Sequence, residues 1–163
     1  MANALPARTL LDYFRHAAES GKPDLLVSKV NGAWTPVPAQ EFGRRTRAFG
    51  IGLTTLGVDH DDRVAILSEN RPEWAMADFG TLGIGAITVP IYTTYLAPQV
   101  EYILRDCGAK VLVVSNGKEL AKVMDARGRC PALLHVVVVE GEVPNADGVL
   151  SFETVVRRGE EEL

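Results

Sequence analysis

The strongest constraint on the fold of this chain is a pair of short, wholly apolar runs. Residues 111–114 and 136–139 contain only valine and leucine, with no polar residue at alternate positions. A strand with one face in water would alternate apolar and polar side chains, so both faces of these strands must be covered. Helices on each side of a parallel sheet provide that cover, and the sequence therefore predicts an α/β fold with a mostly parallel sheet flanked by helices.

The sequence after residue 60 supports this class because short β-branched segments alternate with helical ones. We predict strands at 64–68, 86–91, 110–115 and 135–140, and helices at 72–83, 98–107, 118–127 and 152–158. Residues 141–148 are interpreted as a polar turn that leads directly into the last helix. Residues 61–163 are therefore expected to form a βα-repeating core.

Residues 1–60 are expected to form a peripheral helix, hairpin and helix. Thr9 to Asp12 has the pattern of a capping box, which begins a first amphipathic helix. Asn31-Gly32 between two short strand-like runs predicts a β-hairpin. Apolar residues recur at helical spacing over 39–56, which predicts a second helix. Its opposite face carries Arg44, Arg45 and Arg47, which we predict to be solvated.

The composition excludes several kinds of partner and site. The 163 residues are 47% hydrophobic and 23% charged, enough for one domain with a core, and the net charge of −4 argues against nucleic acid. Cys107 and Cys130 are too far apart for a CxxC motif and are predicted to be reduced packing thiols. His16, His60 and His135 lie in separate predicted elements, so no metal site is predicted.

Neither a signal peptide nor a transmembrane segment is predicted. Charged residues and Pro6 interrupt residues 1–18 before an apolar run reaches signal length, so the cytoplasm is the expected compartment. Residues 79–100 carry no charge and are long enough to span a bilayer. Their glycines and prolines, among them Gly83 and Pro90, favour the end of a helix followed by a strand instead.

Ligands of open parallel sheets gather at the carboxyl ends of the strands, where three turns are candidates. In residues 68–70, Asn70 is interpreted as an N-cap, with Pro72 in the first turn and Glu73 at N3. In residues 115–118, Lys118 is placed at a helix N-terminus, where an anion would be favoured, although a lone lysine there is usually solvated.

The third turn, Tyr92, Thr93 and Thr94, follows a predicted strand. An aromatic ring and two hydroxyls can flank a nucleobase and bind its polar edge, or bind an amide of pantetheine. The sequence contains no dinucleotide GxGxxG in the required context, no Walker loop and no GxSxG elbow. No complete catalytic constellation is therefore predicted.

Several phrases in sequence order resemble the N-terminal region of long-chain fatty-acid–CoA ligases, within the adenylate-forming, AMP-binding acyl-CoA synthetase superfamily. The phrases are residues 62–74 with Glu-Asn-Arg-Pro-Glu-Trp, 85–94 with Val-Pro-Ile-Tyr, 102–106 and 109–111. The resemblance covers about residues 10–163 and implies that residues 1–163 are a partial N-terminal domain of the adenylate-forming fold. It also implies a parent enzyme that activates a fatty acid with ATP and Mg²⁺ and passes the acyl group to CoA.

The resemblance also implies which parts this sequence lacks. The phosphate loop, the residues for magnesium and ribose, and the catalytic lysine of such enzymes lie downstream of a segment like this one. The isolated chain is therefore expected to be inactive and to hold no cofactor. In acetyl-CoA synthetase-like relatives an aromatic-plus-glycine stretch that touches the CoA nucleotide occupies the place of Tyr92, Thr93 and Thr94, so CoA contact is expected there. Threonines stand here where those relatives carry glycines.

Three alternatives and two further expectations accompany this interpretation. The chain could be a free-standing nucleotide-binding module of flavodoxin-like shape or a non-catalytic association module. The parent could also be an adenylation domain that feeds a carrier protein instead of CoA. Long-chain relatives can pair through N-terminal regions, so a homodimer is an expected partner state, as is peripheral contact with a membrane.

Overall fold

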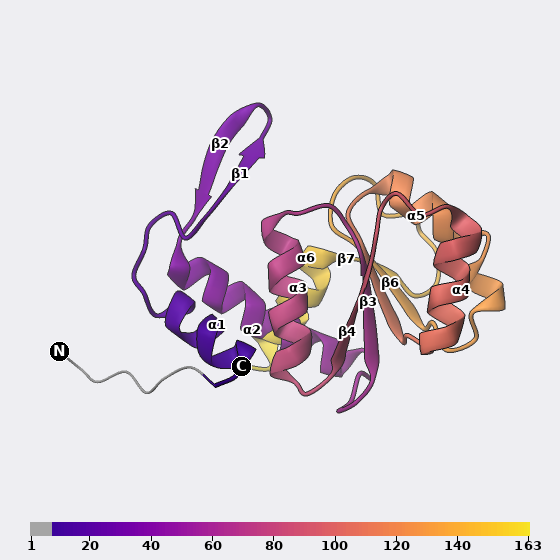
Figure 1. The fold of residues 1–163 in the computed structure, drawn as a ribbon, viewed down its shortest axis with the longest axis horizontal. Helices are drawn as coiled ribbons and strands as arrows, with labels where there is room; N and C mark the ends of the chain where they lie inside the picture. Colours follow the sequence, from indigo (N-terminus) through magenta and orange to yellow (C-terminus); the bar gives the residue numbers. More distant parts are fainter. Residues whose placement is uncertain (1–7) are drawn as a thin grey trace.

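Five short strands lie side by side and run in one direction through the middle of the molecule (Figure 1). The computed structural model describes residues 8–163. Its strands are β1 (Leu26–Val30), β2 (Ala33–Val37), β3 (Arg63–Leu67), β4 (Ile87–Ile91), β5 (Val111–Val114), β6 (His135–Val138) and β7 (Val149–Ser151). Its helices are α1 (Leu10–Ala18), α2 (Ala39–Thr55), α3 (Pro72–Gly83), α4 (Ala97–Cys107), α5 (Gly117–Met124) and α6 (Phe152–Glu161), with a 3₁₀ turn at Arg127–Arg129. The predicted α/β class is confirmed.

The sheet has the order β4-β3-β5-β6-β7, and each pair of neighbours is parallel. The chain leaves β3 towards β4 on one side and later returns to β5 on the other. The point where the order reverses therefore lies between β3 and β5. Strand β7 was not predicted, because its three residues are too few to show a periodicity. Pairing of Val149 with Val136 of β6 creates it.

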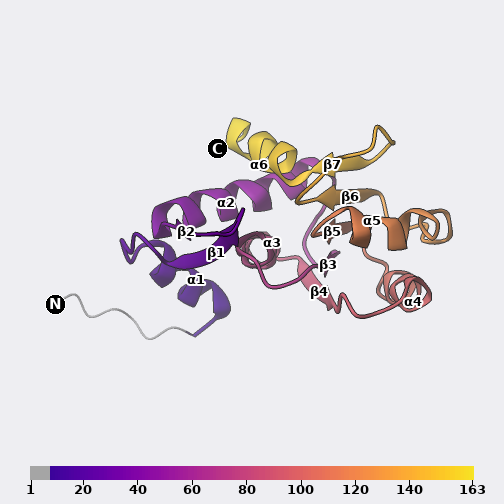
Figure 2. The same cartoon turned by 90° about the horizontal axis from the view of Figure 1, so that it is seen from above.

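The sheet separates two apolar layers. Along β5, Val111 and Val113 face the layer that holds α2, α3 and α6, whereas Leu112 and Val114 face the layer under α4 and α5. Figure 2 shows these two groups of helices on opposite sides of the sheet. All four side chains are buried, which explains why the strand carries no polar position.

Helix α2 lies against both α1 and α3 and also against α6, which comes much later in the chain. A methyl group at Gly52 of α2 or at Gly159 of α6 would overlap the backbone of the facing helix. Glycine therefore allows these two helices to approach at backbone distance. The ring of Phe49 on α2 stacks on Phe152 of α6 with centroids 4.4 Å apart.

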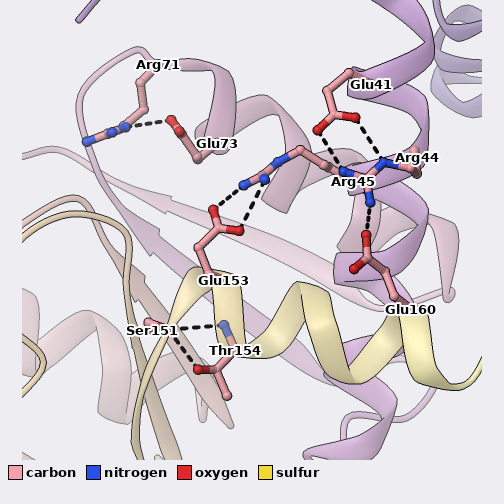
Figure 3. Close-up of polar contacts among 9 residues, drawn as sticks. All are labelled: Glu41, Arg44, Arg45, Arg71, Glu73, Ser151, Glu153, Thr154 and Glu160. Carbon is pink, nitrogen blue, oxygen red and sulfur yellow. Dashed lines mark hydrogen bonds and ion pairs between the residues drawn. The ribbon is translucent and has the colours of Figure 1, made fainter.

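The prediction that the arginines of α2 are solvated is wrong for Arg45, whose side chain is only 18% exposed. Arg45 forms a two-pronged ion pair with Glu153 of α6. Arg44 pairs with Glu41 on its own helix and with Glu160 of α6, as Figure 3 shows. The packing of α6 on this face of α2 is the reason, and the helical spacing within α2 does not reveal it.

The predicted hairpin and the first helix cap are confirmed. Asn31 and Gly32 connect β1 and β2 with φ angles of 49° and 84°, as a tight two-residue turn requires. The hairpin projects from the rest of the molecule in Figure 1. Thr9 and Asp12 form the capping box of α1. Part of the segment searched for a signal peptide, residues 1–7, lies outside the described residues.

Candidate functional site at the carboxyl edge of the sheet

The turns that follow β3, β4 and β5 lie at one edge of the sheet, because parallel strands end on the same side. This edge is uppermost in Figure 1. The structure therefore places all three predicted turns along one rim. The β3 and β5 turns are neighbours at the reversal point, and the β4 turn lies beyond β3.

Arg71 organises the turn after β3. The prediction that Asn70 caps the following helix is wrong: Arg71 is the N-cap residue, its side chain makes no capping bond, and Pro72 begins the helix. Glu73 therefore occupies N2 and pairs with Arg71 at 2.7 Å. Arg71 Nη1 also lies 3.1 Å from Glu140 Oε2, beyond the end of β6.

A second group of polar residues follows β5. The Asn116 side chain accepts hydrogen bonds from the amides of Lys118 and Glu119, at 3.0 and 3.2 Å, and so caps α5. A hydrogen bond from Ser115 is the largest cause that lowers the pKa of the Glu69 carboxyl, with smaller contributions from its own amide and nearby cations. The carboxylate form of Glu69 is thus favoured, and the exposed Lys118 is one of the cations that contribute.

The turn after β4 presents the predicted residues Tyr92, Thr93 and Thr94. The amide of Tyr95 donates to the carbonyl oxygen of Tyr92 at 3.1 Å, which closes a four-residue turn. The Tyr92 ring is 72% exposed and meets the Tyr95 ring edge to face at 5.7 Å. Within residues 8–163, Asn31 and Asp61 are the only residues besides glycines with positive φ, so both threonines fit the turn without backbone strain.

Lys122 of α5 belongs to this site and was missed in the sequence. Its Nζ donates to the carbonyl oxygen of Thr93 at 2.5 Å and lies 2.7 Å from Oε2 of Glu119. Lys122 follows Lys118 by one helical turn, so the sequence could have indicated that both lysines lie on the same face of α5. Only the packing of α5 beside the β4 turn distinguishes the two lysines.

A large hollow lies elsewhere on the rim, between the β1–β2 hairpin and the β3 turn. Its volume is about 920 Å³, and Trp34, Lys29, Arg71 and Glu140 are among the residues that line it. It is open to solvent and carries charges of both signs. It does not include Tyr92, Thr93 or Thr94.

The described residues offer no ligand set for a metal. Within residues 8–163 there is no group of three or more His, Cys, Asp or Glu side chains that could hold a metal ion. Cys107 and Cys130 are free thiols, as predicted, and burial raises the pKa of each. The described helices include none with the length and hydropathy that a membrane crossing requires.

Comparison with known proteins gives consistent matches. The family model described as AMP-binding enzyme matches residues 14–161. The long-chain-fatty-acid–CoA ligase FadD15 of Mycobacterium bovis is 41% identical over 135 residues, which are 82% of this chain and 22% of that protein. The long-chain-fatty-acid–CoA ligase heimdall of Drosophila melanogaster is 29% identical, over 86% of this chain and 21% of that protein.

Two solved structures agree with the fold. The anthranilate CoA ligase AuaEII, in complex with anthranoyl-AMP, matches with a TM-score of 0.70 and 36% identity over 76% of this chain and 23% of that one. The adenylation domain of a carboxylate reductase from Mycobacterium chelonae matches with a TM-score of 0.80 and 20% identity over 96% of this chain and 30% of that one. The chain spans about a fifth of the length of the curated relatives it matches.

Proposed function

Because this chain belongs to the family of AMP-binding enzymes, we propose that it is the N-terminal region of an ATP-dependent fatty acyl-CoA ligase. The observation that supports this most is its identity to a long-chain-fatty-acid–CoA ligase over 82% of the chain. In the proposed reaction a fatty-acid carboxylate attacks the α-phosphate of ATP and displaces pyrophosphate. The thiol of CoA then attacks the acyl carbon, and AMP leaves.

The described residues fit only one part of this chemistry. They provide no cluster for Mg²⁺, and the sequence has no glycine-rich loop for the phosphates of ATP. We therefore assign none of them a role in the transfer to ATP. The β4 turn supports a contact with a nucleotide, since it offers an exposed aromatic side chain with two threonines beside it. We propose that Tyr92, Thr93 and Thr94 contact the nucleotide of CoA in the parent enzyme.

The 163-residue chain alone is expected to be inactive. Exchange of labelled pyrophosphate into ATP, measured with fatty acids of several lengths, should stay at the level of a blank. The same assay on the longer protein that contains this chain should show exchange. Exchange by the isolated chain well above the blank would contradict the proposal.

Replacement of Tyr92 by alanine in that longer protein tests the contact with CoA. Loss of one stacked base should raise KM for CoA by about tenfold, because stacking on an aromatic side chain contributes roughly 1–3 kcal/mol. The rate of pyrophosphate exchange should not change, since it reports formation of the acyl-adenylate, which precedes the reaction with CoA. Tyr102→Ala is the matched control, because Tyr102 is also exposed, at 69%, but lies on α4. An unchanged KM for CoA in Tyr92→Ala would exclude the contact.

The strand order favours one second candidate. The order β4-β3-β5-β6-β7 corresponds to the 2-1-3-4-5 order of flavodoxin-like folds, whose ligand binds where the order reverses. A free-standing cofactor-binding module would bind there, beside Arg71 and Ser115. Submicromolar binding of FMN or NAD by the purified chain, measured by calorimetry, would favour this candidate over the ligase.

We propose four further properties on the same basis. The chain divides into a peripheral part, 1–60, and a core, 61–163. The parent is cytoplasmic, with peripheral contact to a membrane where its fatty acid resides, and its acceptor is CoA and not a carrier protein. Self-association to a homodimer is supported by the open edge of β4, where Ile87 is 45% exposed.

A further inference from the structure

Glu119 is a carboxylate with an unusual position, fully buried on the first turn of α5. Within residues 8–163, neither of its oxygens has a hydrogen-bond partner of good geometry. Its one ion-pair partner in the same residues is Lys122, at 2.7 Å. A buried carboxylate without a countercharge is costly, so this lysine is required where it lies.

Lys122 connects this buried charge to the candidate site. Its side chain is only 17% exposed, and its ammonium group reaches across to the carbonyl oxygen of Thr93 at 2.5 Å. Thr93 is the second residue of the turn that the Tyr95 amide closes. One donor of the ammonium group is used by the Thr93 carbonyl, and the charge of the group is balanced by Glu119. The lysine cannot swing into solvent without leaving both Glu119 and the Thr93 carbonyl without their charged partner.

We propose that Lys122, held by Glu119, is the positioning residue that fixes the turn carrying Tyr92, Thr93 and Thr94. Through it, α5 sets the place and the orientation of the Tyr92 ring. The role in CoA binding rests on the proposed function of this turn, whereas the role in ordering the turn does not. The parent enzyme thus gains a rigid CoA-facing loop without glycines.

Hydrogen exchange of the Tyr95 amide in the 163-residue chain tests the ordering role. This amide closes the turn, so its exchange rate reports how often the turn opens. Lys122→Met should accelerate its exchange by about tenfold or more, because hydrogen bonds to charged groups are among the stronger ones. Lys122→Arg keeps a cation in reach and should retain much of the protection. Lys118→Met, an exposed lysine one turn earlier on the same helix, should leave the rate unchanged.

Lys122→Met also leaves Glu119 buried without a countercharge, which can unfold the whole chain. Global unfolding would speed exchange at Tyr95 even if the bond to Thr93 played no part. The double variant Glu119→Gln with Lys122→Met removes both charges and still lacks the bond to Thr93. It should fold, with the amide of Leu120 in α5 as protected as in the parent chain, and should show the fast exchange at Tyr95. Slow exchange at Tyr95 in this double variant would overturn the inference.

Kinetics of the longer protein separate this inference from the proposed function. In the double variant, KM for CoA should rise by about tenfold with pyrophosphate exchange unchanged, as expected of a loosened site. Fast exchange at Tyr95 with an unchanged KM for CoA would uphold the ordering role and exclude CoA as the ligand of the turn. A raised KM for CoA with slow exchange at Tyr95 would exclude Lys122 as the residue that orders it.

Discussion

At the scale of single residues, the charged side chains of residues 62–74 connect strands and helices that lie far apart in the sequence. Asp62 Oδ2 lies 2.6 Å from Lys110 Nζ, which joins the start of β3 to the residue before β5. Arg63 Nε donates to the carbonyl oxygen of Cys107 at 2.6 Å, at the end of α4. Arg71 connects the ends of β3 and β6. These contacts explain why this stretch contains charged residues beside a buried strand.

Asp62 makes the stability of the chain sensitive to acid. The hydrogen bond from Lys110, followed by that from the Asp59 amide, lowers the pKa of this carboxyl below its ordinary value of 3.8. A lowered pKa means stabilisation that is present above the ordinary value and is lost as the pH falls through the lowered one. Below about pH 4, the unfolding free energy of Asp62→Asn should therefore fall less steeply with pH than that of the parent chain.

Urea unfolding at a series of pH values measures this slope. Asp24→Asn, at an exposed position, serves as the control and should follow the parent chain. Equal slopes for Asp62→Asn and the parent chain would show that the ion pair does not contribute.

At this scale the sequence indicated which residues could form a site, but it did not indicate which distant residues those side chains contact. Tyr92, Thr93 and Thr94 could be selected because a strand directly precedes them. Lys122 could not, because its partner Thr93 is 29 positions away and is reached only when α5 packs beside the β4 turn. Arg45 was misplaced for the same reason, since Glu153 lies 108 positions later.

At the scale of elements, the contact between α2 and α6 depends on glycine. A methyl group at Gly159 would overlap the carbonyl of Ala48, and backbone cannot yield as a flexible side chain can. Gly159→Ala should therefore destabilise the chain by roughly 2–3 kcal/mol or more, in spite of the better helix propensity of alanine.

Gly83→Ala is the matched control for this substitution. Like Gly159, Gly83 lies in the last turn of a helix and has no positive φ, but an added methyl group there would find no atom within 4 Å. Alanine there should be neutral or stabilising by up to about 1 kcal/mol. Thermal unfolding compares the two variants, and equal effects would refute the close approach of the helices.

The bounds of a helix or strand were predictable where residues that begin or end such elements, such as proline and glycine, stand at both ends. Helix α3 was predicted over 72–83 and is observed as Pro72–Gly83, because proline begins it and glycine ends it. Its cap was misassigned by one residue, since Arg71 takes the N-cap position for its ion pairs across the rim. Strand β7 exists only because β6 offers it a free edge.

At the scale of the whole molecule, the two apolar layers share one sheet and should unfold together. Phe152 is buried in the layer of α2, α3 and α6, and Leu112 in the layer of α4 and α5. Replacing either by alanine should lower stability by about 3–4 kcal/mol, because each leaves a cavity. Leu112→Ala should shift the transition seen at Trp74, although Trp74 packs in the other layer.

Urea titrations followed by far-UV circular dichroism and by Trp74 fluorescence test this coupling. A Trp34→Phe background removes the signal of the exposed hairpin tryptophan. Coincident midpoints are expected for the parent chain and for both variants. A Trp74 transition that does not move in Leu112→Ala would mean that the two layers unfold independently.

The glycine contact between α2 and α6 also dictates when this protein can finish folding during its synthesis. Arg45 and Glu153 are 108 positions apart, and nearly everything between them is translated first. Until α6 leaves the ribosome, the face of α2 that packs on α6 lacks this cover, and Phe49, fully buried in the finished fold, lacks the Phe152 ring that stacks on it. The nascent chain must therefore carry this apolar face of α2 without the cover of α6 until residues 152–161 have been translated, and exposed apolar surface of that kind favours aggregation.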